Sequence, residues 1–394
     1  MVGIAAVLVS IAACPSHSSS AHEKPVPIGK MKFERIDNRI FVPVMINGQG
    51  PFHMILDTGA NLAVSPEVAR RAGLKVESSG ETGGVGERTV PVQYTHVGEL
   101  SFGPVHLENL ESAIISTADS SYVFGHVPVD GFFGLEVFQK YVVSHDYLNR
   151  ELSFYDPEKY SYDGPGEAIA FHRDGNIPVI HASFDGTEAE FGVDTGARSA
   201  LILYGPFVAA NRLMEKYQPK FQGVSGWGIG GPVRSYMIRS HSLRIGHFEL
   251  HDLIARLSVN KSGVTASSGK AGLIGPDVLK QFIFICDYRR GRLIFEKNQN
   301  FGLRDSYDRA GVWLSQQGEA FEVFDVISGG PADLAGLKTG DTVIAVDGTA
   351  SARLVLTEVR DRWKRAEPGT AVKVRVRTGS GDVRDVRLTL KDLV

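Results

Sequence analysis

Two copies of the motif Asp-Thr-Gly-Ala, at residues 57–60 and 194–197, could place a pair of carboxyl groups in matching surroundings. Hydrolysis of an amide needs a base that deprotonates water and an acid that protonates the carbonyl oxygen or the leaving nitrogen. Two carboxyl groups about 3 Å apart cannot both ionise, so they share one proton and can supply both functions. Whether Asp57 and Asp194 can work in this way depends on the elements that position them.

The elements around the two motifs also repeat, which indicates two copies of one structural unit. Each motif follows an apolar strand, and a hairpin with an Asn-Gly or Asp-Gly turn is predicted before it. An apolar-apolar-Gly element ends 77 residues after Asp57 and 81 residues after Asp194. Between the Asp-Thr-Gly motif and the apolar-apolar-Gly element, each copy has a helix that begins with Pro, a glycine-rich segment and a further strand. The helices begin near residues 65 and 205, and the glycine-rich segments lie at 83–86 and 226–231.

Residues 35–300 resemble the aspartic peptidases, and each repeat is similar to one retropepsin-type lobe. The resemblance implies a mainly β, bilobal pepsin/retropepsin-like fold built from two homologous β lobes. It also implies that Asp57 and Asp194 are the catalytic pair that activates a water molecule. The residues that would support this pair are Thr58, Gly59, Thr195 and Gly196. No covalent intermediate, cofactor or metal ion is needed for such a reaction.

The glycine-rich segments are predicted to be flaps that close over substrate and exclude water. The candidate flap and substrate-binding residues are Gly84, Gly86, Trp227 and Gly228, although ordinary flexible loops would have a similar composition. One departure from the repeat is Arg198, which follows the second motif directly. Close to the aspartates it would favour their ionised forms; otherwise it points to solvent or forms an ion pair.

Residues 310–394 resemble a bacterial PDZ domain, a small β barrel with two helices. Such domains bind an extended peptide by strand addition and capture its terminal carboxylate on backbone amides. The resemblance places the carboxylate loop at Gly311, Val312, Trp313 and Leu314. Because Trp313 stands where the family usually has Gly, the tryptophan could narrow this pocket. A C-terminal peptide ligand and intramolecular docking onto the protease lobes are therefore both possible.

The N-terminus predicts export. An apolar stretch from Val2 to Ala13 precedes Cys14, which stands in a lipobox-like context and is the candidate lipidation site. No Lys or Arg precedes the stretch, which departs from an export signal. We expect a periplasmic or lipid-anchored protein of a bacterial cell envelope. The predicted segments are 1–22 for export and linker, 30–160 for lobe 1, 166–300 for lobe 2 and 310–394 for the PDZ domain.

Composition and motif searches narrow the function classes. The net charge of −3 provides no basic surface for nucleic acid, and no apolar run after the N-terminus is long enough to span a bilayer. The chain lacks the His-Glu-x-x-His spacing of a zinc peptidase and the Gly-x-Ser-x-Gly elbow of a serine hydrolase.

Two function classes remain. The first is an aspartic endopeptidase that acts on a peptide or protein substrate, with a PDZ domain that handles substrate or regulates activity. The second is a catalytically silent, protease-like PDZ scaffold that binds peptides in the cell envelope. A membrane contact is expected only through a lipid anchor. A monomer is expected because two fused lobes need no partner to complete the pair of aspartates.

Overall fold

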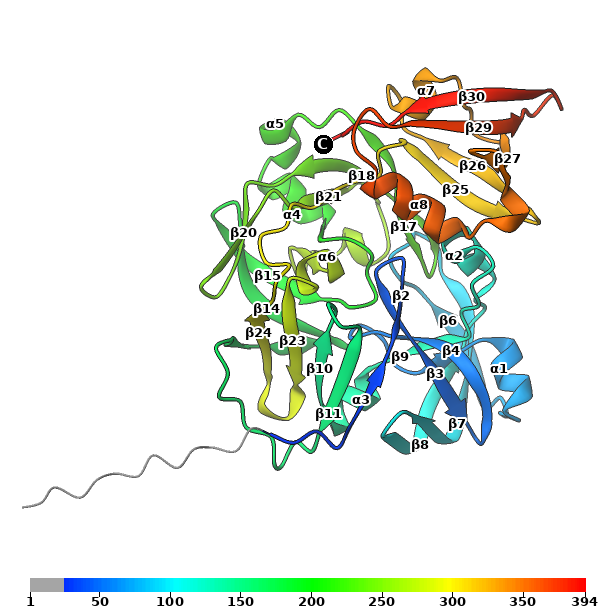
Figure 1. The fold of residues 1–394 in the computed structure, drawn as a ribbon. Coiled ribbons are helices and arrows are strands. Elements are labelled where there is room, and N and C mark those ends of the chain that lie inside the picture. Colours follow the sequence, from blue (N-terminus) through cyan, green and yellow to red (C-terminus); the bar gives the residue numbers. More distant parts are fainter. Residues whose placement is uncertain (1–24) are drawn as a thin grey trace, which may run out of the picture.

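The computed structural model describes residues 25–394, which form two β lobes joined by a common sheet and a third β domain at the C-terminal end (Figure 1). The predicted mainly β, bilobal fold with a C-terminal PDZ domain is confirmed. The predicted export segment and Cys14 lie outside the described residues. Within residues 25–394, no helix is both long and apolar enough to cross a membrane.

Lobe 1 is an eight-stranded sheet in which the strand that leads to Asp57 lies near the centre. The predicted Asn-Gly turn joins β3 to β4, and both turn residues have positive φ angles of 49° and 72°. In spatial order the strands are β2 (Glu34–Ile36), β3 (Arg39–Ile46), β4 (Gln49–Leu56), β9 (Gly131–Phe133), β5 (Ala63–Val64), β8 (Val105–Ile114), β7 (Val90–Phe102) and β6 (Ser78–Thr82).

Lobe 2 repeats this arrangement around Asp194. Its Asp-Gly turn joins β14 to β15, and β15 then runs parallel to β22 as β4 runs parallel to β9. In spatial order the strands are β17 (Gln222–Gly228), β18 (Gly231–Arg239), β21 (Ile254–Ser258), β16 (Leu201–Leu203), β22 (Gly272–Ile274), β15 (Thr187–Val193), β14 (Ile177–Phe184), β19 (Ser242–Ile245) and β20 (Phe248–His251), with β13 (His172–Asp174) on β14.

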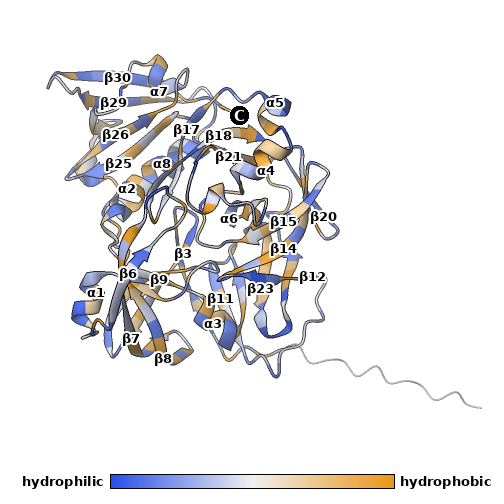
Figure 2. Ribbon diagram, turned by 180° about the vertical axis from the view of Figure 1, so that it is seen from behind, coloured by the Kyte–Doolittle hydropathy of each residue, from blue (hydrophilic) through white to orange (hydrophobic). Residues whose placement is uncertain are grey.

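A third sheet takes strands from both lobes. Its central pair is β10 (Val142–Asp146) with β23 (Phe282–Asp287), so backbone hydrogen bonds join the lobes directly. The full order is β1 (Gly29–Lys32), β11 (Glu151–Tyr155), β10, β23, β24 (Arg292–Lys297) and β12 (Glu167–Ala170). One continuous cluster of buried apolar side chains runs through both lobes, and hydrophobic residues recur along inner strands such as β14 and β15 (Figure 2).

Short helices connect these strands. The predicted helix at residue 65 is α1 (Pro66–Arg71), whose first turn is capped by the hydroxyl of Ser65, and its counterpart is α4 (Gly205–Ala210). The other helices of the lobes are α2 (Ser121–Phe124), α3 (Leu135–Lys140), α5 (Leu213–Tyr217) and α6 (Pro276–Leu279), with 3-10 turns η1 (Ala118–Ser120), η2 (Val264–Ala266) and η3 (Tyr288–Arg290).

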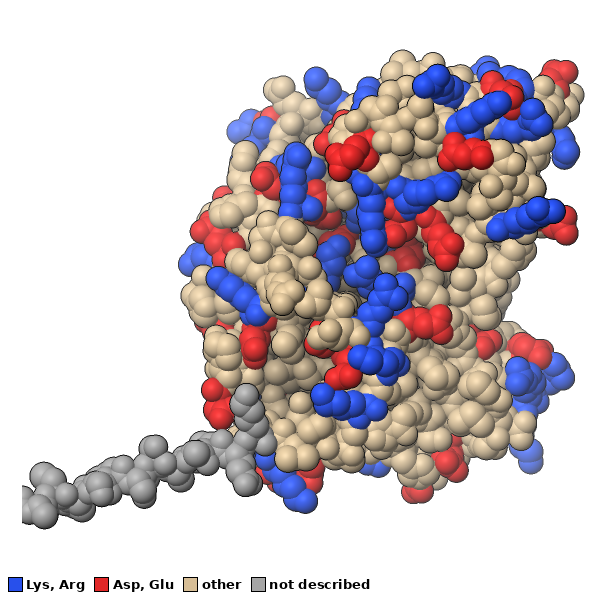
Figure 3. Space-filling model, in the orientation of Figure 1, with Lys and Arg blue, Asp and Glu red and all other residues tan. Residues whose placement is uncertain are grey.

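The C-terminal domain has its own sheet and its own apolar core. The strand order is β25 (Val312–Gln317), β26 (Ala320–Val326), β27 (Thr342–Val346), β29 (Ala371–Arg377) and β30 (Val383–Thr389), with β28 (Thr349–Ala350) on β27. Its helices are α7 (Pro331–Leu334), the turn η4 (Ser351–Arg353) and α8 (Leu356–Arg365). Acidic and basic side chains are mixed on the face shown in Figure 3, which includes this domain.

Candidate active site

The two Asp-Thr-Gly loops meet between the lobes. Each aspartate follows the last residue of a central strand, and its backbone amide is held by the neighbouring parallel strand. The amide of Asp57 donates to the carbonyl of Phe133 at 2.8 Å, and the amide of Asp194 donates to the carbonyl of Ile274 at 2.9 Å. The apolar-apolar-Gly elements singled out in the sequence therefore support the two loops from below.

The threonines lock the loops to each other. The amide of Thr58 donates to Oγ1 of Thr195 at 3.0 Å, and the amide of Thr195 donates to Oγ1 of Thr58 at 3.0 Å. Each hydroxyl donates in turn to a carbonyl of the opposite lobe, that of Val193 at 2.7 Å and that of Leu56 at 3.2 Å. Both threonines are fully buried, so these four bonds fix the spacing of the loops without competition from water.

Glycine is required where the loops approach most closely. A Cβ on Gly196 would collide with the carboxylate of Asp57, and a Cβ on Gly134 would collide with the carbonyl of the same residue. Neither collision could be relieved without moving the aspartate. The two glycines therefore let the backbone come close enough for the carboxyl groups to pair.

The two carboxyl groups are in unequal surroundings. Asp194 accepts hydrogen bonds from the amides of Gly196 at 2.8 Å and Ala197 at 3.0 Å, whereas Asp57 accepts one from Gly59 at 2.7 Å. Burial and the negative charge of Asp194 raise the pKa of Asp57 well above its usual range. Burial also raises the pKa of Asp194, but its two amide donors oppose that shift. The two amide donors therefore favour the ionised form of Asp194, and Asp57 is the better site for a shared proton.

Arg198 does form an ion pair, with a partner that the sequence analysis missed. Its guanidinium donates to both carboxylate oxygens of Asp37, with Nη2–Oδ1 at 2.7 Å. Arg39 reaches the same carboxylate at 2.5 Å and donates from Nε to the carbonyl of Gly196 at 2.7 Å. Burial would raise the pKa of Asp37, but the two arginines lower it to about 2. Asp37 therefore offsets the charge of both guanidinium groups, although Arg39 still acts to lower the pKa of Asp57 and Asp194.

Asp37 lies in the tight turn between β2 and β3, where Asp37 and Asn38 have positive φ angles, and Arg39 is the first residue of β3. An Asp-Asn pair signals a turn in the sequence. The local sequence contains nothing that shows contact with a residue 161 positions away. Arg39 lines the cleft beside the aspartates.

The predicted flaps are the hairpins β6–β7 and β17–β18, and their tips touch. The amide of Gly86 donates to the carbonyl of Ile229 at 3.0 Å, and the amide of Arg88 donates to the carbonyl of Gly230 at 3.2 Å. A Cβ on Gly84 would meet Ile229, and one on Gly228 would meet Val85. The small residues thus allow two backbones to lie in contact over the cleft.

Beneath the tips is a cleft of about 1000 Å³ that contains both aspartates. Gly84, Trp227 and Gly228 line it. At the end beside the PDZ domain, the rings of Trp227 and Tyr122 stack with centroids 4.5 Å apart, and Phe324 of the PDZ domain packs edge-on against Trp227 at 4.9 Å. The PDZ domain therefore supports one wall of the cleft.

Two of the predicted carboxylate-loop residues present their amides to a carboxylate of the same chain. The amides of Gly311 and Val312 donate to Oδ2 of Asp308 at 2.8 and 3.2 Å, and that of Ala310 donates to Oδ1 at 3.2 Å. Three consecutive amides around one carboxylate form a backbone nest of the kind that captures peptide C-termini. In this structure Asp308 occupies the nest.

The other two predicted loop residues have different surroundings. The side chain of Leu314 lies in the apolar core of the PDZ domain. The ring of Trp313 lies between the guanidinium groups of Arg198 and Arg360, at 5.0 and 4.5 Å from its centroid, and Nε1 donates to the carbonyl of Tyr122 at 3.2 Å. Trp313 therefore contacts lobe 1 and lobe 2.

Helix α2 of lobe 1 lies against both the edge strand β25 and helix α8 of the PDZ domain (Figure 1). Arg360 on α8 donates to the carbonyls of Val123 at 2.7 Å and Tyr122 at 2.9 Å. Val123 and Phe124 also line the cleft that contains the two aspartates. One short helix thus connects the cleft to the PDZ edge where a peptide strand would add.

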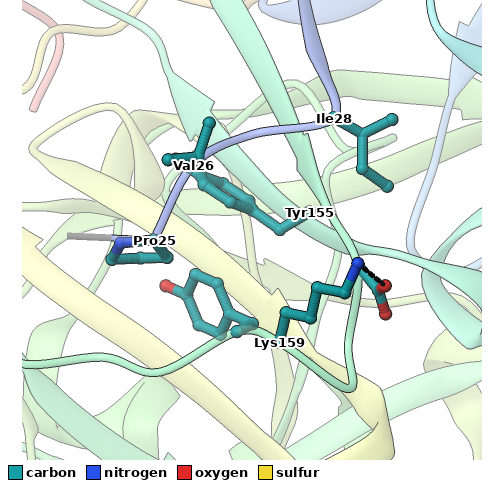
Figure 4. A pocket seen from close by; sticks show the side chains of 7 residues that line it. Pro25, Val26, Ile28, Tyr155 and Lys159 are labelled. Atoms are coloured by element: carbon teal, nitrogen blue, oxygen red, sulfur yellow. Dashed lines mark ion pairs between the residues drawn. The ribbon is translucent and has the colours of Figure 1, made fainter. Parts of the chain in front are cut away.

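A separate hollow lies near the start of the described chain and shares no lining residue with the cleft. It is formed by Pro25, Val26 and Ile28 with Tyr155 and Tyr160, and its charged pair is Lys159 with Asp156 at 3.7 Å (Figure 4). Among residues 25–394, no group of three His, Cys, Asp or Glu side chains is placed to hold a metal ion.

Comparisons with known protein families match two segments of the chain. A family model described as aspartyl protease matches residues 42–137, which include Asp57, and a PDZ domain model matches residues 308–390. A search of curated proteins gave no match. Among solved structures, the aspartic proteinase from Irpex lacteus aligns with 70% of this chain and 98% of its own at 14% identity, with a TM-score of 0.48. By these two family models, the chain combines an aspartyl protease domain with a C-terminal PDZ domain.

Proposed function

We propose that the protein is an aspartic endopeptidase whose catalytic pair is Asp57 and Asp194. The observation that carries this proposal is the reciprocal hydrogen bonding of Thr58 and Thr195, which holds two partly buried carboxyl groups together under a roof of two flaps. A structural aspartate would not need a like-charged partner in the same cleft. The raised pKa of Asp57 keeps the proton that the reaction requires.

The surroundings of the carboxyl groups assign their initial roles. Asp194, whose anion is stabilised by two amides, takes a proton from a water molecule as the water oxygen attacks the scissile carbonyl carbon. Asp57 gives its proton to the carbonyl oxygen, which forms a neutral tetrahedral diol. Asp194 then gives its proton to the nitrogen while Asp57 takes a proton from one hydroxyl of the diol. The C–N bond breaks, a carboxylic acid and an amine are released, and the pair returns to its singly protonated state.

Substrate access requires the flap tips to separate. The contacts that would break are the backbone bonds from Gly86 and Arg88 to the second flap and the amide of Val264 to the carbonyl of Gly84. Closure over a bound peptide would exclude bulk water and strengthen every charge interaction within the cleft.

We further propose that the PDZ domain regulates the protease through internal docking rather than through delivery of substrate. Asp308 takes the place of a peptide carboxylate in the amide nest, and α2 covers the edge of β25 beside α8. Because α2 also borders the cleft, a peptide that displaced it would move a cleft wall. Arg360→Gln should loosen the contact of α2 with the PDZ domain and so increase the affinity of the protein for C-terminal peptides. Surface plasmon resonance with immobilised peptides would measure this affinity. Unchanged peptide binding would contradict internal docking.

The central test is cleavage of a mixed peptide library between pH 4 and 7, read by mass spectrometry. The wild type should cut, and Asp57→Asn and Asp194→Asn should each abolish the cleavages; pepstatin provides a second, optional probe. A wild type that cuts nothing while it binds the same peptides would instead favour the silent scaffold. Cleavage that persists in both variants would disprove the assignment of the pair.

We also propose an exported protein of the bacterial cell envelope, on the basis of the apolar stretch before Cys14. Labelling of cells with an alkyne fatty acid would test it. Label should be incorporated into the wild type and not into Cys14→Ala, while an unlabelled but truncated protein would indicate an ordinary cleaved signal.

A further inference from the structure

Arg256 distinguishes the cleft wall of lobe 2 from that of lobe 1. In lobe 2, the parallel pairing of β16 with β21 sets Ile202 beside Arg256; in lobe 1, the parallel pairing of β5 with β8 sets Ala63 beside Ala113. Ile202 and Ala63 are themselves equivalent, because Ile202 pairs with Leu273, the middle residue of β22, and Ala63 pairs with Phe132, the middle residue of β9. Arg256 therefore occupies in lobe 2 the position that Ala113 occupies in lobe 1, and both line the cleft.

The wall around Ala113 is apolar. Ala113 packs, with Phe132 and the flap residue Ile229, against a buried cluster of Ala63, Val92 and Ile115. Such a wall suits an apolar substrate side chain, because it offers no charged partner.

The surroundings of Arg256 are different. Its side chain is only 5% exposed, Nη1 donates to the carbonyl of Ser225 in the second flap, and the buried Nε has no hydrogen-bond partner. Among the described residues, no carboxylate forms an ion pair with it. The charged neighbour that acts on it most strongly is Arg198, a cation already neutralised by Asp37.

The other cations that line the cleft have carboxylate partners. Arg39 and Arg198 share Asp37, and Lys270 pairs with Asp174. A buried guanidinium without an anion is costly, so its retention at the wall of a binding cleft calls for an anion from outside the chain.

We infer that Arg256 binds a carboxylate of the substrate, so that the protease prefers peptides with an acidic residue, or with their own terminal carboxylate, in the subsite of lobe 2 beside the second flap. The planar fork of Arg can hold a carboxylate through two parallel N–H donors. The opposite subsite, around Ala113, takes an apolar side chain. This inference rests on the proposed peptidase function and specifies its substrate class.

The test uses peptides that the wild type cleaves, each synthesised with Glu and with Gln at every position around the cut, and with a free or amidated C-terminus. At one position on one side of the cut, Glu should be preferred by at least about tenfold in kcat/KM. In Arg256→Gln that ratio should fall to about one, with Gln peptides still cleaved. The matched control is Arg244→Gln, an exposed arginine of lobe 2 paired with Glu188, which should keep the ratio.

The peptides separate the two sources of the carboxylate. Faster cleavage of the free than of the amidated peptide identifies the terminal group, and a preference for Glu over Gln that persists after amidation identifies the acidic side chain. Equal rates for Glu and Gln at all positions, together with equal rates for free and amidated C-termini, in the wild type would overturn the inference while leaving the peptidase intact, even if Arg256→Gln failed to fold. If no peptide is cut, the peptidase proposal fails. The affinities of the Glu and Gln peptides, measured by fluorescence anisotropy, then decide on Arg256 alone.

Discussion

The two lobes are alike where the chemistry needs two of the same part and different where only one of them meets the PDZ domain. Both supply an Asp-Thr-Gly loop, a threonine that bonds across, and a parallel strand beneath. Four residues after the aspartate, however, lobe 1 has Asn61 and lobe 2 has Arg198, whose guanidinium lies over Trp313 of the PDZ domain. The elements present in both lobes therefore position the two carboxyl groups. Arg198, which is present in lobe 2 alone, connects that site to the PDZ domain.

The helices beneath the loops show the same division. Two residues after the supporting glycine, Glu136 of lobe 1 accepts the amide of Leu62 at 2.7 Å within its own lobe. The corresponding Asp277 of lobe 2 instead pairs with Lys364 of the PDZ helix at 3.1 Å and accepts from Asn38 at 2.8 Å. Burial would raise the pKa of Asp277, but Lys280 and Lys364 lower it well below its usual range. A carboxylate that serves one lobe in the first copy therefore joins three parts of the molecule in the second.

The largest effect is expected on catalysis, where both lobes should be required. Asp57→Asn and Asp194→Asn should each lower kcat/KM by about 10³-fold or more, because either change removes one of two coupled proton-transfer groups. Steady-state cleavage of a fluorogenic peptide would measure it. A variant that retained a tenth of the activity would show that one lobe can catalyse alone.

The wild-type pH profile sharpens the same point. Activity should fall at high pH as the pair loses its shared proton, and at low pH as Asp194 takes up the second proton. Because both pKa values are raised, both limbs should lie above about 3.9, the ordinary value of an aspartate. An acid limb well below that value would contradict the burial of the pair.

The next largest effect concerns a part that lobe 1 lacks. Arg198→Met should cost about 3 kcal/mol in the free energy of unfolding, because it leaves the buried carboxylate of Asp37 with Arg39 alone and removes a cation from the face of Trp313. Urea unfolding would measure it. The control Arg244→Met, which breaks an exposed pair in the same lobe, should stay within about 0.5 kcal/mol.

The pH dependence of that cost follows from Asp37. Its folded-state pKa, about 2, lies below the unfolded value of about 3.9, so the ionised form stabilises the fold above pH 4 and this contribution disappears as the pH falls through 2. The penalty of Arg198→Met should therefore be constant above about pH 5 and smaller at pH 3. A penalty that grew on acidification would place the role of Arg198 outside this pair.

The sequence predicted the two duplicated lobes and the PDZ domain, but it missed the contacts that join them. The repeat of strand, Asp-Thr-Gly-Ala and apolar-apolar-Gly was sufficient to predict both lobes and to nominate Asp57 and Asp194, because a repeat can be aligned with itself. Asp37 and Asp308 have no counterpart to align with, and each works through contacts with distant residues or with backbone amides. Their roles depend on tertiary packing, which leaves no local pattern of hydropathy or spacing.

A smaller effect on stability is expected where the two threonines join the lobes. Thr58→Val and Thr195→Val should each cost about 2 kcal/mol, because each leaves a buried amide and a buried carbonyl of the opposite lobe without a partner. Thermal or urea unfolding would measure both, and the two values should agree to within about 0.5 kcal/mol. The serine variants, which keep the hydroxyl, should retain most of the stability, and the double valine variant should cost less than the sum because the bonds are shared. Clearly unequal losses in the free energy of unfolding would mean that the two threonines do not contribute equally to the junction of the lobes.

The smallest effect lies in the helices that follow the two loops. The hydroxyl of Ser65 accepts the amide of Val68 at 3.2 Å at the start of α1, whereas the residue before α4, Tyr204, makes no such bond. Ser65→Ala should therefore cost about 1 kcal/mol in lobe 1, and Ser65→Thr, which keeps the oxygen, should cost less. In lobe 2, Tyr204→Phe removes only a hydroxyl that has no hydrogen-bond partner and should leave the start of α4 unaffected.

Hydrogen exchange of the amides in the first turn of each helix would separate the two cases: Ser65→Ala should accelerate exchange in α1 alone. Equal acceleration in α4 would mean that the two lobes open together and that the duplicated helices are not independent parts.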